Sequence, residues 1–286
     1  MTSQLKTGFF LAFLTGILLL IGQSLGGRGG LMVALVFAVA INSVSYWFSD
    51  RIVLSMYGAR ELAPDDAPGL FAIVRDLAHR ADTPMPRLYL IEEEAPNAFA
   101  TGRDPAHAAL AVTEGLVRSL SPDEVRGVLG HEMGHVVNRD ILIQSVAATI
   151  AGAISGLSAM IRWGAIFGLS RDGEDGGNPV GALVMAIVAP IAALLVQMAI
   201  SRSREFGADQ AGARLSGNPM YLASALSKLD AAARELPMNQ GSPATAHMFI
   251  VNPFSGGVLS TLFSTHPPIA ERIERLRQMA AGGREW

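Results

Sequence analysis

The sequence predicts a mainly helical integral membrane protein that carries a smaller water-soluble α+β domain. Half of its 286 residues are hydrophobic and only 16% are charged, which is too apolar for an ordinary soluble protein. Four long apolar runs lie along the chain, each close to or above the length that a membrane-spanning helix requires. Charged residues gather between the second and third runs and after the fourth. The net charge of −3 gives no indication of nucleic-acid binding, and the absence of cysteine excludes disulfides and thiolate metal sites.

The first two runs, Gly8–Leu25 and Leu31–Phe48, predict a transmembrane hairpin over residues 1–49. A glycine-rich stretch separates them, and Tyr46 and Trp47 end the second run as an interfacial belt. The first run also fits a cleaved signal peptide. We favour the hairpin because the second run follows within a few residues and no A-x-A cleavage pattern separates the two.

Residues 50–140 have the composition of a soluble domain. The spacing of apolar residues predicts a helix over Pro68–Arg80, and three short apolar segments predict strands at Arg87–Ile91, Asn97–Thr101 and Ala108–Thr113. We expect these strands to form a small antiparallel sheet just before the next helix.

That helix carries His131, Glu132 and His135 in the pattern HExxH. Residues i and i+4 lie on one helical face, so both imidazoles can hold one Zn²⁺, while Glu132 can take a proton from a water molecule. A capping box, Ser121 with Glu124, opens the helix. A chance match on an ordinary helix is the alternative, and the well-started helix makes it the weaker one.

A catalytic zinc site needs a third protein ligand. Glu205 and Asp209 are again four residues apart on one predicted helical face. Glu205 can complete the site with one Zn²⁺ per chain, and Asp209 can orient a ligating histidine through its second ring nitrogen. The alternative is a solvated acidic pair beside Arg202 and Arg204.

Residues 141–200 contain the other two apolar runs, Ile141–Ile161 and Val180–Ile200. They predict a second transmembrane hairpin, with a helical hairpin buried inside the soluble domain as the alternative. Residues 201–286 then form the second part of the soluble domain, with amphipathic helices expected at Pro219–Leu236 and Ile269–Ala280.

The apolar runs place the ligand sets near the membrane. His135 precedes Ile141 by six residues, and Glu205 follows Ile200 by five. The histidine pair and Glu205 are therefore both expected within roughly 10 Å of the membrane surface. More basic residues flank this side than the other. The positive-inside rule therefore predicts that the soluble domain and both termini are cytoplasmic.

Four segments together resemble the HtpX-type membrane zinc metalloproteases, relatives of the CAAX prenyl proteases. These are the decapeptide His131–Asp140, Ser201–Asp209, Asn97–Gly102 and Thr265–Pro268. The resemblance implies a zincin-like cytoplasmic domain, residence in the bacterial inner membrane, and cleavage of misfolded or damaged membrane proteins and unfolded polypeptides in stress-related quality control.

Mapped onto this chain, the resemblance makes His131, His135 and Glu205 the zinc ligands, Glu132 the general base and Asp209 the support of a ligating histidine. A Phe at position 206, where Tyr is more usual in the family, is a mild departure that should not touch the chemistry.

Four further residues have weaker assignments. His266 can donate to the oxyanion during hydrolysis or cap the last helix. Arg272 can hold a carboxylate of the site or be solvated. Asn97 and Ala98 lie on a strand beside the motif, where a peptide substrate can add as a further strand, although Asn97 can also simply end that strand.

Two other functions stay open at this point. One is a prenyl-CAAX-type processing protease, which is expected to have more than four spans enclosing a chamber. The other is a non-catalytic membrane scaffold or transporter, and the absence of charges within the four runs counts against a transporter.

Overall fold

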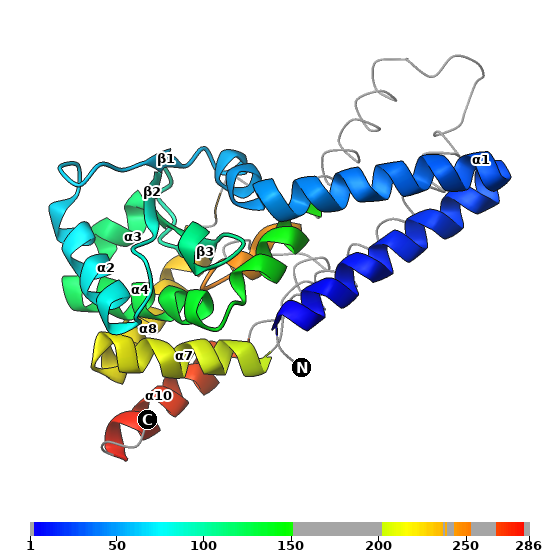
Figure 1. Cartoon of the computed structure of the whole chain (residues 1–286). Helices are drawn as coiled ribbons and strands as arrows, with labels where there is room; N and C mark the ends of the chain where they lie inside the picture. The colour runs from blue at the N-terminus through cyan, green and yellow to red at the C-terminus, as the bar shows by residue number, and fades with distance from the viewer. Residues whose placement is uncertain (1–2, 151–201, 237, 239–242, 253–266, 283–286) are drawn as a thin grey trace, which may run out of the picture.

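The structure is a computed structural model that describes residues 3–150, 202–236, 238, 243–252 and 267–282. Figure 1 shows a long two-armed helix, α1 (Ser3–Met56), projecting from a body of helices around a small sheet. The elements of the body are, in order, β1 (Arg60–Glu61), α2 (Pro68–Arg80), β2 (Arg87–Ile91), β3 (Ala98–Thr101), the 3₁₀-helix η1 (Pro105–His107), β4 (Ala109–Thr113), α3 (Glu114–Ser119), α4 (Pro122–Val137), α7 (Arg202–Ser216), α8 (Pro219–Glu235), the 3₁₀-helix η2 (Pro243–Met248) and α10 (Ile269–Ala281).

The helix α1 reverses direction at the glycine-rich stretch between the first two apolar runs (Figure 1). Gly27 has φ of +54°, which favours glycine. The two arms approach so closely beyond this bend that a Cβ on Gly22 would lie 2.5 Å from the carbonyl oxygen of Gly30. Farther along, Asn42 Nδ2 donates a hydrogen bond to Thr15 Oγ1 at 2.8 Å. The arms thus form a packed helical hairpin.

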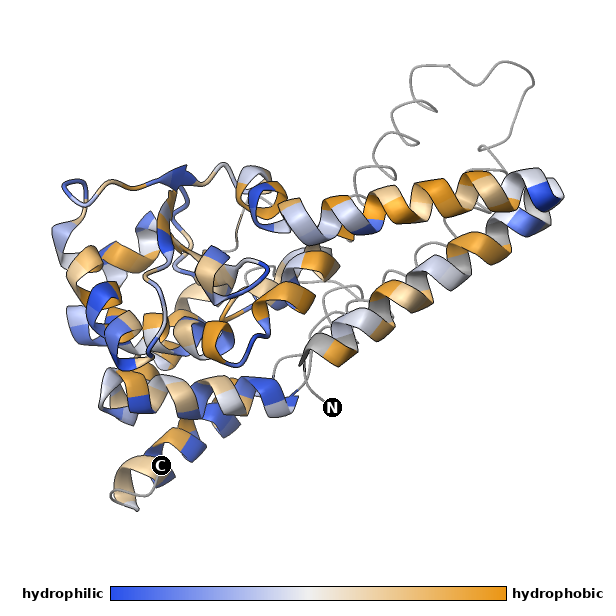
Figure 2. Ribbon diagram, viewed as in Figure 1, coloured by the Kyte–Doolittle hydropathy of each residue, from blue (hydrophilic) through white to orange (hydrophobic). Residues whose placement is uncertain are grey.

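One described helix is long and apolar enough to cross a membrane, namely the second arm, Gly26–Met56. Only 11% of its most apolar window is buried, and Figure 2 shows hydrophobic residues along both arms of α1. Thr7–Leu20 and Ile141–Ile150 are shorter apolar helices, and residues 180–200 lie outside the described part. The expectation of four hydrophobic helices is therefore supported for one of them.

The sheet is mixed, so the prediction of an antiparallel sheet is wrong. Its order is β1-β2-β4-β3, and β2 pairs with β4 in parallel, with Arg87 opposite Ala109 and Ile91 opposite Thr113. The other two pairs are antiparallel. The strand β4 is buried along its whole length. The strands β2 and β3 pair with its two edges, and two apolar clusters cover its faces, with Leu110 and Val112 on one side and Ala109 and Ala111 on the other. The two-residue strand β1 was not predicted.

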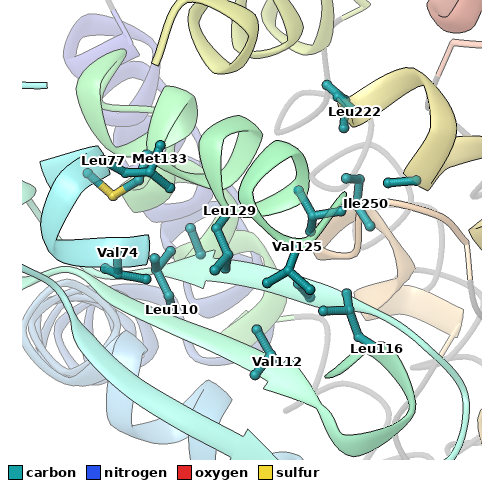
Figure 3. Close-up of a cluster of buried hydrophobic side chains, with 14 of the residues drawn as sticks. Val74, Leu77, Leu110, Val112, Leu116, Val125, Leu129, Met133, Leu222 and Ile250 are labelled. Atoms are coloured by element: carbon teal, nitrogen blue, oxygen red, sulfur yellow. The ribbon is translucent and has the colours of Figure 1, made fainter. Parts of the chain in front are cut away.

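The main core lies between one face of the sheet and the helices α2, α4 and α8 (Figure 3). Leu110 and Val112 project from β4 toward Leu129 and Met133 of α4. All four side chains are fully buried. The helix α4, which carries the HExxH motif, is thus held on the sheet by its apolar face.

A second, aromatic cluster joins the hairpin to the edge strand. The ring of Tyr57, just after α1, lies 5.6 Å from that of Phe99 in β3 and 5.1 Å from that of Phe249. The hydroxyl of Tyr57 also bonds that of Thr245. Burial raises the pKa of Tyr57 to about 12 despite this bond, so the phenol stays neutral. The base of the hairpin is therefore fixed to the strand that borders the site described next.

Candidate metal centre

The helix α4 presents the motif through a strong N-terminal cap. Ser121 Oγ accepts the Glu124 N–H at 3.3 Å, and Glu124 Oε2 accepts the Ser121 N–H at 2.8 Å. Pro122 occupies the first turn, where its missing N–H is not needed. Glu124 also accepts hydrogen bonds from Ser224 and Lys228 of α8, at 2.7 and 2.8 Å. These contacts fix both the start of α4 and its packing on α8.

Glycines let α4 and α7 pack backbone against backbone. A Cβ added to Gly212 would lie 2.6 Å from the backbone nitrogen of His131. A Cβ on Gly130 or Gly134 would lie 2.9 or 2.8 Å from a carbonyl oxygen of α7, that of Gly212 or Ala208. Since no larger residue fits these positions without a shift of the helices, the glycines set the distance between the motif and α7.

This packing brings Glu205 of α7 to the two histidines. Its carboxylate oxygens lie 3.7 Å from His131 Nε2 and 3.6 Å from His135 Nε2. One ligand atom from each of the three residues lies within 4.8 Å of the others, and all three residues are buried. Ligands about 2 Å from a tetrahedral zinc lie roughly 3.3 Å apart, so the set fits this ion. The sequence prediction brought together the same three residues.

A carboxylate lies behind each histidine. Asp209 Oδ1 is 2.9 Å from His131 Nδ1, as the i+4 spacing from Glu205 predicted. Asp140 Oδ2 is 3.5 Å from His135 Nδ1, a role that the sequence analysis missed. The chain reaches Asp140 through Arg139, whose φ is +57°, so that the Asp140 N–H can bond the carbonyl of His135 at 2.9 Å. Helical spacing alone does not indicate a residue beyond such a turn.

Arg272 of α10 is buried beside the centre. Its Nε and Nη2 donate to the two oxygens of Asp209 at 2.9 and 2.7 Å, and its Nη1 donates to the carbonyl of Ile250 at 3.0 Å. Nη1 also lies 3.9 Å from a carboxylate oxygen of Glu205. Of the two readings left open by the sequence, the side chain holds a carboxylate of the site and is not solvated.

Burial and charge set different protonation states for the histidines. Burial, reinforced by Arg272, lowers the pKa of His131 to about 4, which leaves the neutral imidazole that a metal binds. Burial also disfavours a charge on His135, but Asp140 and Glu205 outweigh it and raise the pKa of His135 to about 9. A positive charge is thus favoured where Glu205 faces His135. A divalent cation would supply that charge and displace the proton.

The pKa values of two carboxylates near the centre are shifted in opposite directions. Burial, with Glu205 adding to it, raises the pKa of Glu132 to about 8. Burial opposes the ionisation of Asp209 too, but Arg272 and His131 lower its pKa to about 2. Asp209 is therefore a fixed anion, whereas Glu132 can exchange a proton near neutral pH.

Glu132 faces the edge strand of the sheet. Its carboxylate faces the backbone N–H of Ala100 in β3, which favours the ionised form and lowers the pKa of Glu132 against the effect of burial. Along an antiparallel edge strand, the backbone N–H and C=O groups of every second residue point away from the neighbouring strand. In β3 these residues are Ala98 and Ala100, whose backbone groups point away from β4. The general-base candidate and the outer edge of β3 are thus in contact.

The predicted substrate residues lie on this edge, but another segment of the chain contacts them. Asn97 Nδ2 donates to the carbonyl of Val251 at 2.8 Å, and the carbonyl of Ala98 accepts the Ile250 N–H at 3.4 Å. The edge is therefore occupied at Ala98. The predicted donor His266 lies outside the described residues.

Comparisons with known proteins place this arrangement in a wider group. A family model described as Peptidase family M48 matches residues 64–280, a span that includes all of the site residues described above. The Protease HtpX homolog of Syntrophobacter fumaroxidans is 57% identical over 282 residues, with 98% of this chain and 100% of that protein covered. Protease HtpX of Legionella pneumophila is 53% identical over 281 residues, with the same shares covered.

A relative from a third organism is as similar. The Protease HtpX homolog of Thermococcus kodakarensis is 57% identical over 277 residues, with 96% of each chain covered. Among solved structures, the crystal structure of S. mikatae Ste24p matches with a TM-score of 0.51 at 19% identity. The match covers 96% of this chain but 64% of the length of Ste24p, and at this identity it supports the fold alone.

Proposed function

The chain belongs to peptidase family M48, and from that premise we propose the role of each side chain in its site. The protein is a membrane-bound zinc metalloprotease, so its reaction is the hydrolysis of a peptide bond. We assign His131, His135 and Glu205 as the zinc ligands. Their geometry and the chemistry of two imidazoles and one carboxylate support this assignment.

Bound there, Zn²⁺ supplies a Lewis acid that polarises a carbonyl oxygen and lowers the pKa of water to about 7. Glu132 takes a proton from the water that attacks the scissile carbonyl and returns it to the leaving amine. A cation beside Glu132 favours its ionised form, which is the form that accepts a proton. Burial keeps competing water away from this carboxylate.

Asp209 and Asp140 are positioning residues in this proposal. Each faces the Nδ1 atom of one histidine, so each directs the other ring nitrogen toward the metal. Arg272 holds Asp209 through both of its oxygens. His266 is kept as the proposed oxyanion donor on the strength of the sequence alone.

A substrate is proposed to add to the outer edge of β3. Main-chain hydrogen bonds recognise the backbone of a substrate whatever its side chains are. This suits a protease that cleaves unfolded or misfolded polypeptides, including damaged membrane proteins. Because Ile250 and Val251 contact Ala98 and Asn97, and the Ala100 N–H faces Glu132, we narrow the direct contact to the outward carbonyl of Ala100. Asn97 and Ala98 then act indirectly: they hold Ile250 and Val251, which lie at one end of the proposed substrate-binding edge.

We further propose that the protein resides in the bacterial inner membrane with its site on the cytoplasmic side. The apolar second arm of α1 and the bias of flanking basic residues support this topology. The site would then meet the exposed loops of membrane proteins where they leave the bilayer.

One observation carries the proposal: three buried ligands converge, and Glu132 stands beside them on α4, facing the edge strand β3. The test is an assay of purified protein in detergent, with zinc content and cleavage of an unfolded membrane protein measured on the same preparation. We expect about one zinc per chain and cleavage that a chelator abolishes. Zinc retained in full by Glu205→Ala would remove Glu205 from the ligand set. A protein that cleaves only a prenylated peptide would point to the processing protease instead.

A further inference from the structure

A cavity of about 510 Å³ lies where the second arm of α1 meets the body. Trp47 and Arg51 line it from the helix, Arg87 from β2, and Arg103 and His107 from the connection between β3 and β4. The ligands of the metal centre do not line it. It is therefore separate from the proposed peptidase chemistry.

If the second arm of α1 spans the bilayer as proposed above, the cavity lies at the depth of phospholipid headgroups. The second apolar run ends at Phe48. Before that residue, the second arm of α1 exposes apolar side chains such as Val36 and Phe37 on its surface. Arg51 follows within one helical turn, or about 5 Å along the axis. The headgroup layer beyond the hydrocarbon core is of similar thickness, about 5 to 7 Å. Trp47, which is 54% exposed, has the position of an interfacial aromatic residue.

The charges of the cavity are mostly positive. Arg87 is paired with Asp50 at 2.7 Å, and Arg103 lies 3.6 Å from Asp104. Arg51 has no carboxylate partner within the described residues, and its guanidinium lies 5.8 Å from the centre of the Phe48 ring. With Asp50 and Asp104 counted against the three arginines, one positive charge stays uncompensated.

Two features hold these donors in place. The Arg103 guanidinium stacks over the Trp47 ring at 5.0 Å, which joins the β3–β4 connection to the membrane helix. His107 Nδ1 lies 2.7 Å from Asp104 Oδ1, so the other ring nitrogen is left for a further partner. Arginines presented in this way match the paired oxygens of a phosphodiester.

We propose that this cavity binds the headgroup phosphate of an anionic phospholipid of the phosphatidylglycerol class. Arg51 and Arg103 contact the phosphodiester oxygens, and Trp47 packs along the glycerol and upper acyl region. Basic cavities at the cytoplasmic end of membrane helices are a known means of binding anionic headgroups. An uncharged or zwitterionic lipid would leave the positive charge uncompensated.

The proposed lipid would also orient the peptidase site. Arg103 directly follows Gly102, the first residue after β3, and β3 is the strand that Glu132 faces. Gly102 has φ of +137°, and its N–H donates to Ser145 Oγ at 3.2 Å, so the turn is tightly held. A phosphate bound to Arg103 would therefore fix the edge strand relative to the bilayer surface.

The test is a titration of the full-length zinc protein in neutral detergent micelles, with bound lipid counted by native mass spectrometry. Phosphatidylglycerol is compared with phosphatidylcholine and with inorganic phosphate. We expect a saturable site for phosphatidylglycerol, at least tenfold weaker binding of phosphatidylcholine, and no competition from equimolar phosphate. Arg51→Gln and Arg103→Gln should each weaken the binding of phosphatidylglycerol by about tenfold.

Arg118→Gln is the matched control, because this arginine is 60% exposed on α3 and does not line the cavity. Arg51→Gln keeps the proposal testable if Arg103→Gln misfolds, since it leaves the Trp47 contact intact. Equal binding of the two lipids, or unchanged binding by Arg51→Gln, would overturn the proposal. Displacement by inorganic phosphate would show a site for free anions and would overturn it as well. None of these readouts depends on peptidase activity.

Discussion

Arg272 holds both carboxylate oxygens of Asp209, at 2.9 and 2.7 Å, and Asp209 in turn lies 2.9 Å from His131 Nδ1. The three side chains are buried and come from α10, α7 and α4. The last helix of the described chain is therefore connected to a proposed zinc ligand through one carboxylate. This connection explains why a site built on two helices needs a third one far along the sequence.

Arg272→Gln should destabilise the protein by about 3 to 5 kcal/mol, because it leaves the buried charge of Asp209 without its partner. Asp209→Asn alone should weaken zinc binding or activity by about 10- to 100-fold. In the double variant, the loss of unfolding free energy should be smaller than the sum of the losses in the two single variants, since both charges are removed together. The same should hold for the loss of zinc affinity. Thermal unfolding and zinc affinity measure the cycle, and Arg277→Gln, an exposed arginine on the same helix, is the control. Strict additivity would mean that the two residues act separately.

Gly212→Ala should displace α7 from α4, because the new Cβ would lie 2.6 Å from the backbone nitrogen of His131. Glu205 moves with α7, so we expect a lower unfolding temperature together with weaker zinc binding. Gly207→Ala on the same helix is the matched control, since its nearest neighbour would be Asn138 Nδ2 at 3.7 Å. That change should be neutral or stabilise by up to about 1 kcal/mol through helix propensity. A Gly212→Ala protein with normal zinc affinity would show that the close approach is not needed.

Glu124 predicts a specific loss of stability in acid. Burial alone would raise its pKa, but Lys228, the Ser121 N–H and Ser224 together lower it to about 2, from 4.5. The folded pKa lies below the unfolded one, so this stabilisation is present above about pH 4.5 and is lost as the pH falls toward 2. The full effect amounts to about 3 kcal/mol.

Glu124→Gln should therefore unfold at a lower temperature than the parent at pH 7, and the difference should shrink as the pH falls from 5 to 3. The comparison is made on the same detergent preparation across that range. A difference that stays constant with pH would mean that the charge of Glu124 contributes nothing.

The proposed topology predicts the position of two reporters. A reporter fused after Trp286, or inserted within Ala63–Pro68, should report from the cytoplasm. Proteolysis of intact spheroplasts gives an independent measurement, since the loop before α2 should be protected until the membrane is opened. Cleavage of that loop in intact spheroplasts would reverse the orientation.

The sequence predicted the elements with strong local patterns. The helix bounds around Pro68–Arg80 and the strand Arg87–Ile91 agree with α2 and β2, because apolar spacing and flanking prolines specify them locally. The convergence of Glu205 with the histidine pair was also predicted, because i,i+4 spacing on two helices leaves few other arrangements.

The features that depend on tertiary placement were not predicted. The strand order is one, since nothing within the segment Ala109–Thr113 says that it lies beside β2. Asp140 is another, because it reaches His135 only through the turn at Arg139. The contact of Ile250 with both Ala98 and Arg272 joins segments far apart in the chain, and no spacing rule reports it.

The central claim is that Glu132 moves the proton while His131, His135 and Glu205 hold the metal. The most direct measurement is the zinc content and the turnover of Glu132→Gln against the parent, on the same preparations. Gln keeps the shape of the side chain but cannot take a proton, so the variant should retain about one zinc per chain and lose at least about 10² to 10⁴ in rate. A Glu132→Gln protein that keeps its zinc and cleaves the unfolded membrane protein at a near-normal rate would contradict the account.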